Sequence, residues 1–217
     1  MSIKYVIARY NEDISWLPKD SENIIIYNKG EPLNIQNEIL TKNVGRESET
    51  YLKYIIDNYN NLPDVVVFSQ AKISDHINTN IYNDQYKYLE ILGNEALING
   101  MNTTDLLIIL KEHPDIICHM GPEWNYKHGT DPDNVWYYHK SQYKNGLIKF
   151  NEWLEKHIDI KYELPFKVYC NAIFAVSKNN ILKRNIEYYK KLISTVDWHI
   201  NPIETHFLER SWYYIFA

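Results

Sequence analysis

Val65-Val66-Val67-Phe68 is a run of four apolar residues, three of them β-branched, and the polar pair Ser69-Gln70 follows it directly. A continuous run of this kind predicts a strand that is covered on both faces, as in a parallel α/β sheet. Two similar runs lie upstream, Tyr-Val-Ile-Ala at 5–8 and Ile-Ile-Ile-Tyr at 24–27. Together the three runs predict the first strands of a central sheet.

A helix is predicted between the second and third of these strands. The helical spacing of apolar residues there is carried by Tyr51, Leu52, Ile55, Ile56 and Tyr59. This helix begins near 43–47 and ends before Pro63. The order strand, strand, helix, strand predicts the α/β class, with a mostly parallel sheet flanked by helices. Ligands of such sheets bind at the carboxyl ends of the strands, where this chain has polar loops.

The remainder of the chain is predicted to continue the same domain. Further helices are predicted near 104–111, 143–154, 186–196 and 201–216, and strands at 116–118 and 168–176. Residues 120–139 hold Trp124 and Trp136 and predict a long aromatic loop, a feature that often serves as a lid. We expect a single domain over 1–217, with a nucleotide-binding half at 1–77 and an acceptor half at 78–217.

Composition disfavours several classes of protein. The formal net charge is -5 and the basic residues are scattered, whereas a non-specific nucleic-acid binder carries a basic stripe. No apolar run approaches the roughly 20 residues needed to span a bilayer. Residues 1–4 lead at once into a predicted strand, so no signal peptide is expected. Cys118 and Cys170 are too few for a disulfide framework, and a reducing, cytoplasmic setting is expected.

Two polar segments are candidates for binding a nucleotide. Arg9, Tyr10 and Asn11 follow the first predicted strand and offer donors and acceptors for a base and a ribose; the alternative is a solvated turn that caps a helix. Gly45 permits close approach of the backbone, and Arg46 lies near a predicted helix N-terminus, where an anion is favoured. This segment is either a diphosphate site or a helix start with a surface arginine.

Three further residues follow the third predicted strand. Many nucleotide-sugar enzymes place a carboxylate pair there to hold a divalent metal, but this chain has Gln70. Asp75 and His76 lie five and six residues on. They are candidate metal ligands for Mn or Mg, with Asp75 also a candidate catalytic residue, or else they form a structural hydrogen bond.

The last predicted helix carries two candidate catalytic bases, Glu204 and Glu209. A carboxylate aimed into a cleft can deprotonate an acceptor hydroxyl. His206, Glu209 and Arg210 share one face of this helix, because they lie three and four residues apart. These side chains either serve catalysis or lock the helix to the sheet.

Four segments taken together resemble a known family. They are residues 6–13 with Trp16; residues 43–47 with Tyr51; residues 68–70 with Asp75-His76; and residues 174–177 followed by Glu209-Arg210 and Trp212. The chain resembles a GT-A-like glycosyltransferase domain family, formerly of unknown function, that occurs in bacteria, fungi and large DNA viruses. That family is akin to the glycosyltransferase domain of a chlorella-virus rhamnosyltransferase.

The resemblance implies a GT-A fold with a Rossmann-like half that binds UDP or a similar nucleotide. It implies that Arg9, Tyr10 and Asn11 line the base and ribose, with Asn28 and Lys29 near the base; Gln70 is a further candidate nucleotide-binding residue. Arg46 would approach the diphosphate, and Asp75 and His76 would face the sugar or a metal. Gln70 stands where an Asp-x-Asp pair is expected, so metal dependence stays open.

The function expected is transfer of a sugar from a UDP-sugar to a glycan or glycoprotein hydroxyl. A viral member would act in the host cytoplasm, and the chain could be a module of a larger protein. Two alternatives remain: a non-catalytic nucleotide-sugar or glycan-binding domain, and a metal-dependent hydrolase.

Overall fold

A computed structural model describes residues 2–18, 21–74, 84–99, 135–163 and 172–216. The strands are β1 (Ile3–Arg9), β2 (Ile24–Asn28), β3 (Glu38–Leu40), β4 (Val65–Gln70) and β5 (Phe174–Ser177). The helices are α1 (Arg46–Asn58), α2 (Gln85–Asn99), α5 (Trp136–Lys140), α6 (Phe150–Ile158), α7 (Lys178–Ile181), α8 (Ile186–Ile193) and α9 (Ile203–Phe216), with a 3-10 turn η1 at Tyr59–Asn61. None of the described helices is long and apolar enough to cross a membrane.

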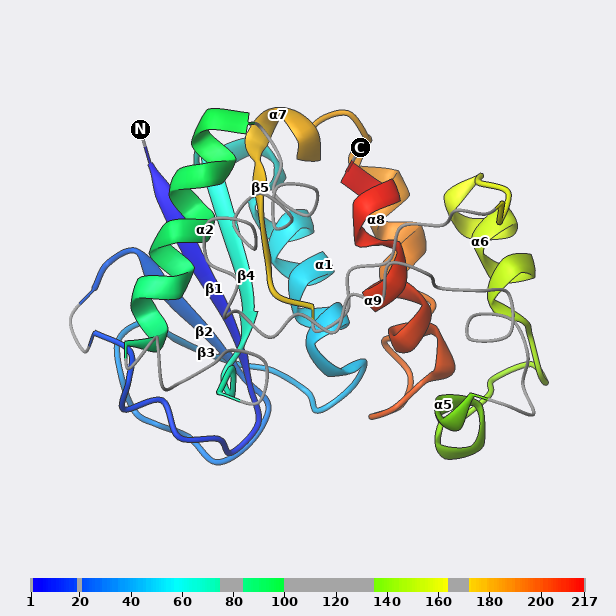
Figure 1. Cartoon of the computed structure of the whole chain (residues 1–217). Helices are drawn as coiled ribbons and strands as arrows, with labels where there is room; N and C mark the ends of the chain where they lie inside the picture. Colours follow the sequence, from blue (N-terminus) through cyan, green and yellow to red (C-terminus); the bar gives the residue numbers. More distant parts are fainter. Residues whose placement is uncertain (1, 19–20, 75–83, 100–134, 164–171, 217) are drawn as a thin grey trace.

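The strands form one mixed five-stranded sheet in the order β3-β2-β1-β4-β5 (Figure 1). β1 is parallel to both β2 and β4, and β2 is parallel to β3. β5 runs antiparallel to β4. This α/β arrangement is compatible with a Rossmann-like fold. The chain leaves β1 toward β2 on one side and later returns to β4 on the other, so the carboxyl ends of β1 and β4 flank the point where open α/β sheets bind ligands.

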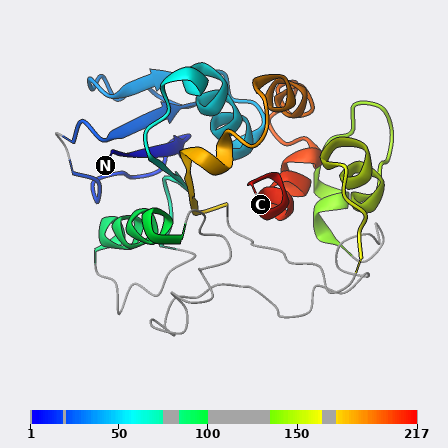
Figure 2. The same cartoon turned by 90° about the horizontal axis from the view of Figure 1, so that it is seen from above.

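Helices cover both faces of the sheet (Figure 2). Side chains alternate between the faces along a strand, so Val66 packs in the core beneath α1, α8 and α9, and Val67 packs in the core beneath α2. Both valines are fully buried. Burial on both faces explains why β1, β2 and β4 are continuous apolar runs.

The predicted elements of the first third are confirmed. β1, β2 and β4 lie at the three apolar runs, and α1 followed by η1 occupies the helix predicted before Pro63. The strand β3 was not predicted. It has three residues, and none of them is buried.

The later predictions were partly confirmed. α8 and α9 match the helices predicted near 186–196 and 201–216. β5 overlaps the predicted strand 168–176 only at 174–176 and extends to Ser177, because 172 and 173 are not part of a strand. The helix predicted from 143 begins only at Phe150, and Leu147 is exposed. The loop predicted over 120–139 is wrong for its last residues, since Trp136 to His139 belong to α5. Residues 120–134, with Trp124, and the elements predicted at 104–111 and 116–118 lie outside the described residues.

Candidate functional site

The loops after β1 and β2 are joined by a hydrogen-bond network. Asn28 is fully buried at the end of β2; its side-chain oxygen accepts a hydrogen bond from Arg9 Nη1 at 2.8 Å, and its amide nitrogen donates to Glu38 Oε1 at 2.5 Å. Arg9 Nε also donates to the Glu12 carbonyl oxygen at 2.9 Å. The structure therefore brings Arg9 and Asn28 together, and in the described contacts they shape the edge of the sheet.

Tyr10 and Asn11 lie in the loop after β1. Asn11 Oδ1 accepts a hydrogen bond from the Glu31 amide at 2.9 Å, which ties this loop to the one after β2. The close approach requires Gly30, because a Cβ there would lie 1.8 Å from the Tyr10 carbonyl oxygen. Tyr10 itself is 50% exposed. Its ring is therefore accessible beside the carboxyl end of β1.

Lys29, which the resemblance implied near the base, has a buried side chain. Its ammonium forms an ion pair with Glu49 at 2.7 Å, and the two side chains are 4% and 9% exposed. Lys29 Nζ also donates to the carbonyl oxygens of Val44 and Arg46, each at 2.5 Å. Burial lowers the pKa of Lys29, and the charge of Glu49 opposes that shift. Lys29 thus holds the first turn of α1 in place.

The first turn of α1 has an unusual backbone. Gly45 and Arg46 both have positive φ angles, 61° and 49°. For a non-glycine residue this region costs roughly 1–2 kcal/mol, and such strain is common at functional sites. The Arg46 side chain is 42% exposed, with Nε 3.5 Å from Glu47 Oε2. Arg46 therefore presents a largely accessible guanidinium at a helix N-terminus, as the sequence predicted.

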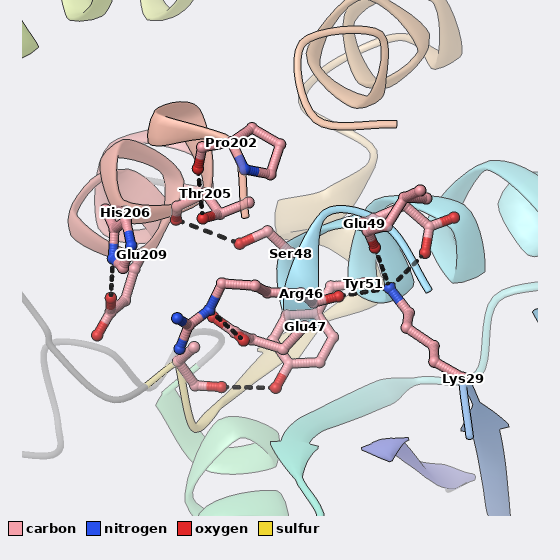
Figure 3. Close-up of polar contacts among 12 residues, drawn as sticks. Lys29, Arg46, Glu47, Ser48, Glu49, Tyr51, Pro202, Thr205, His206 and Glu209 are labelled. Atoms are coloured by element: carbon pink, nitrogen blue, oxygen red, sulfur yellow. Dashed lines mark hydrogen bonds and ion pairs between the residues drawn. The ribbon is translucent and has the colours of Figure 1, made fainter. Parts of the chain in front are cut away.

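Helix α9 places three titratable residues across from this turn. Figure 3 shows Arg46 and Glu47 of α1 facing His206 and Glu209 of α9. Glu209 Oε2 lies 3.1 Å from Arg210 Nη1 and 3.9 Å from His206 Nδ1. The two helices are tied together because Ser48 Oγ donates to the Thr205 carbonyl oxygen at 3.4 Å.

His206, which the sequence placed on the same helix face as Glu209 and Arg210, is the most deeply buried titratable side chain of this group. It is 2% exposed, and its Nε2 has no hydrogen-bond partner among the described residues. Its ring stacks on Tyr137 of α5 at 5.1 Å and meets the half-exposed Trp136 edge-on at 5.3 Å. Burial lowers the pKa of His206, with Arg46 acting in the same direction and Glu209 opposing it. The imidazole is therefore held in its neutral form near pH 7.

Tyr51 and Glu47 extend the group toward the sheet. Tyr51 is fully buried and its hydroxyl donates to the Ala172 carbonyl oxygen at 2.8 Å (Figure 3). Burial raises the pKa of Tyr51 well above its usual range, and the charges of Glu47 and Glu209 add to this shift. The sequence analysis named Tyr51 as an apolar residue of the predicted helix and as part of the resemblance, without a polar role. Its role as a link to residue 172 depends on the folded arrangement and left no local signal.

The other predicted residues lie elsewhere. Glu204 is in the first turn of α9 but lines a separate cleft with α6, away from Arg46. Gln70 ends β4, opposite Ala8 of β1. Asp75 and His76 fall outside the described residues. Among the described residues, no group of three histidine, cysteine, aspartate or glutamate side chains could hold a metal ion.

Comparisons with known proteins give one result. No curated protein and no solved structure matches the chain significantly. A family model described as "Protein of unknown function (DUF3431)" matches residues 5–217, which is nearly the whole chain and includes both α1 and α9. The chain therefore belongs to the family described as Protein of unknown function (DUF3431).

Proposed function

We propose that this protein is a glycosyltransferase that moves a sugar from a nucleoside-diphosphate donor, with UDP-sugars favoured, to a hydroxyl group of a glycan or glycoprotein. The observation that carries the proposal is the accessible Arg46 at the N-terminus of α1, facing Glu209 and the buried His206 of α9. The resemblance described for the sequence supports a GT-A-like fold for this arrangement.

The donor is proposed to lie across the carboxyl edge of the sheet. The first amide groups of a helix lack partners within the helix and attract anions, and an arginine adds paired hydrogen bonds to phosphate oxygens. Arg46 therefore suits the diphosphate. The exposed rings of Tyr10 and Trp136, 50% and 56% exposed, are available to stack on a base or a sugar face.

The transfer step needs one group to receive a proton and one to stabilise the leaving group. The acceptor oxygen forms a bond to the anomeric carbon while the bond from that carbon to the diphosphate oxygen breaks. Arg46 stabilises the charge that the departing diphosphate gains. In an inverting reaction Glu209 takes the proton of the acceptor hydroxyl. Glu209 is preferred to Glu204 because only Glu209 lies with His206 on the side of α9 near Arg46.

A divalent metal fits the described residues poorly. Glu47 and Glu209 are the carboxylates of this group, and they are engaged by Arg46 and Arg210 respectively. The proposed step therefore uses side chains of the protein alone, and turnover is expected to be the same with and without manganese.

The direct test is turnover of a donor panel. The full chain is incubated with UDP-, GDP-, dTDP- and CMP-linked sugars, with and without manganese and with a glycan acceptor, and released nucleotide and free sugar are measured separately. Acceptor-dependent release of one nucleotide is expected. In that assay Glu209→Gln should lower turnover by about a hundredfold or more, the scale of a general base. The exposed Glu187 of α8 provides a matched control, since Glu187→Gln should not change turnover.

The same assay separates the alternatives. Nucleotide binding without release of nucleotide from any donor would indicate a non-catalytic binding domain. Manganese-dependent release of free sugar that ignores the acceptor would indicate a hydrolase. Either result would replace the transferase proposal.

A further inference from the structure

Arg210 is a buried cation to which the proposed transfer step gives no role. Its side chain is 9% exposed, and it directly follows Glu209 in α9. Nη1 of Arg210 donates to Glu209 Oε2 at 3.1 Å and to the His206 carbonyl oxygen at 2.8 Å. These two bonds stay within α9, so they do not join this helix to a neighbour. What they fix is the side chain of Glu209.

The guanidinium of Arg210 packs on Tyr137 of α5. Its carbon Cζ lies 4.4 Å from the centre of the tyrosine ring, and the ring is fully buried. A guanidinium beside an aromatic face is attracted by the negative face of the ring. Tyr137 also stacks on His206 at 5.1 Å, with 16° between the two ring planes. One buried ring therefore supports both Arg210 and His206, which lie beside Glu209.

Arg210 and His206 approach the same oxygen of Glu209. Oε2 lies 3.1 Å from Arg210 Nη1 and 3.9 Å from His206 Nδ1, while the Glu209 side chain is 17% exposed. A carboxylate is planar, so anchoring Oε2 also sets the direction of Oε1. A catalytic base needs such a fixed geometry, because a displacement of about 1 Å can lower a rate by about a hundredfold.

The charges around Glu209 point to a second effect of Arg210. Burial lowers the pKa of His206, and the charge of Arg210 acts in the same direction, so the imidazole is neutral near pH 7. Arg210 is thus a positive charge in contact with the carboxylate, and it favours the ionised form that can accept a proton. The other titratable groups that lie around these side chains are Arg46, Glu47 and Tyr51 of α1 and Tyr137 of α5.

The groups on α1 do not replace this charge. Arg46 and Glu47 lie 3.5 Å apart and oppose each other, and Arg46 is assigned to the diphosphate. Burial raises the pKa of Tyr51 well above its usual range, so its hydroxyl is neutral. The contact at 3.1 Å therefore makes Arg210 the partner that Glu209 needs while the donor is bound.

We propose that Arg210 is the positioning residue for Glu209 in the transfer step, where it directs the carboxylate toward the acceptor hydroxyl and keeps it ionised. Arg210 stays protonated throughout, and the proton of the acceptor passes to Glu209 alone. This role rests on the proposed function, because it belongs to that reaction. It requires no contact between Arg210 and a substrate.

The test compares Arg210→Met and Arg210→Lys with the wild type in the donor and acceptor assay, after thermal unfolding has shown that each variant is folded. Arg210→Met should lower kcat by about tenfold to a hundredfold and leave the KM of the donor within about twofold. The acid limb of its pH–rate profile should move up by about one pH unit, because the ionised carboxylate loses a positive neighbour. Arg210→Lys keeps the charge and should restore the acid limb, with kcat only partly restored because an ammonium lacks the planar fork.

Arg184 provides the matched control, since its guanidinium also lies over a tyrosine ring, that of Tyr188, at 5.0 Å. Arg184→Met should change neither kcat nor the pH–rate profile. If Arg210→Met does not fold, Arg210→Gln replaces it and the same upward move of the acid limb is expected. A lower melting temperature with an unmoved acid limb would mean that Arg210 is only structural, and would overturn the proposal.

A carboxyl titration separates this role from the proposed function. In protein labelled with ¹³C at the glutamate carboxyl carbons, the Glu209 signal is assigned with Glu209→Gln and followed against pH. Its midpoint should lie about one pH unit higher in Arg210→Met than in the wild type. If the wild type is active, an equal midpoint or a wild-type kcat in Arg210→Met would overturn the role of Arg210 alone. If the wild type turns over no donor, the proposed function fails, and a raised midpoint would still retain the coupling of Arg210 to Glu209.

Discussion

Replacing Lys29 tests whether the first turn of α1 is held by a buried cation. Lys29→Met removes an ammonium 2.7 Å from Glu49 Oε2, where both side chains are less than a tenth exposed. Removing one partner of a buried ion pair costs about 3–5 kcal/mol, because the remaining charge stays buried and uncompensated. The carbonyl oxygens of Val44 and Arg46 lose a donor as well. We therefore expect the upper end of that range.

The assay is urea unfolding at pH 7 followed by circular dichroism, with thermal unfolding alongside. For a chain of this size the loss corresponds to a fall of about 6–20 °C in the melting temperature. The double variant Lys29→Met with Glu49→Leu removes both charges and should recover much of the loss, since apolar replacement of a buried pair is often neutral.

An exposed ion pair of the same helix is the matched control. Lys53 and Asp57 lie 2.9 Å apart with side chains 36% and 46% exposed. Lys53→Ala should cost no more than about 1 kcal/mol. If Lys29→Met is as mild as this control, Lys29 does not hold α1 and its assignment as a buried clamp is refuted.

Three further predictions concern stability. Gly45→Ala should lower the free energy of unfolding in urea by more than about 2 kcal/mol, because φ is +61° and the new Cβ would lie 2.5 Å from Glu49 Cβ. Gly146→Ala is the control: φ is +87° but the space around it is open, so the loss should be only about 1 kcal/mol. Equal losses in the two variants would contradict the crowding at Gly45. Tyr51→Phe should cost about 1 kcal/mol by losing the hydrogen bond to residue 172, and an unchanged midpoint would contradict that bond. Burial lowers the pKa of His157 from 6.5 to about 4, so unfolding takes up a proton between these values. The stability linked to His157 is thus fully present above pH 6.5 and is lost as the pH falls toward 4. In His157→Gln, the loss of unfolding free energy between pH 6.5 and pH 4 should be smaller than in the wild type by about 1 kcal/mol, a figure reduced because His157 is partly exposed. An unaltered pH dependence would contradict the lowered pKa.

The central strands could be predicted because a strand that is buried on both faces is a continuous run of apolar residues in the sequence. β1, β2 and β4 are covered on both faces, and only continuous apolar residues suit such positions. β3 left no such signal. It is a short strand at the edge of the sheet, and Glu38 in it serves as an acceptor for Asn28 and for the amides of Leu33 and Asn34. Its presence follows from these contacts and not from hydrophobic pattern.

The direction of β5 relative to β4 could not be predicted from the sequence either. An apolar run predicts that a strand is buried, and it carries no information on whether the strand is parallel or antiparallel to its neighbour. The antiparallel pairing of β5 with β4 depends on how the chain returns to the sheet from residues far along the sequence.

In the candidate site, the position of Arg46 could be predicted from neighbouring residues in the sequence, whereas the burial of Lys29 could not. The helical spacing of apolar residues predicted a helix that begins near 43–47, so Arg46 was predicted at its N-terminus, as the structure has it. A lysine after a strand is usually exposed. Lys29 is buried because Glu49, one turn into α1, lies against it, and that contact joins residues 20 positions apart.

The two candidate bases could not be separated by sequence for a similar reason. Glu204 and Glu209 belong to one helix, and periodicity says only that they lie on different faces. The packing of α6 against α9 places Glu204 in the lining of a cleft that Lys144 and His157 also line, whereas α1 and α5 place His206 and Glu209 near Arg46.

The central claim is that a nucleoside diphosphate binds at Arg46, and calorimetric titration of the full chain tests it most directly. UDP, GDP and dTDP are titrated with and without manganese into the wild type, Arg46→Ala and the control Lys53→Ala. One nucleotide should bind the wild type and Lys53→Ala equally. Its dissociation constant should rise by about tenfold to a hundredfold in Arg46→Ala, the effect of losing charged hydrogen bonds to phosphate. Equal binding by Arg46→Ala, or no binding of any nucleotide to the wild type, would contradict the account.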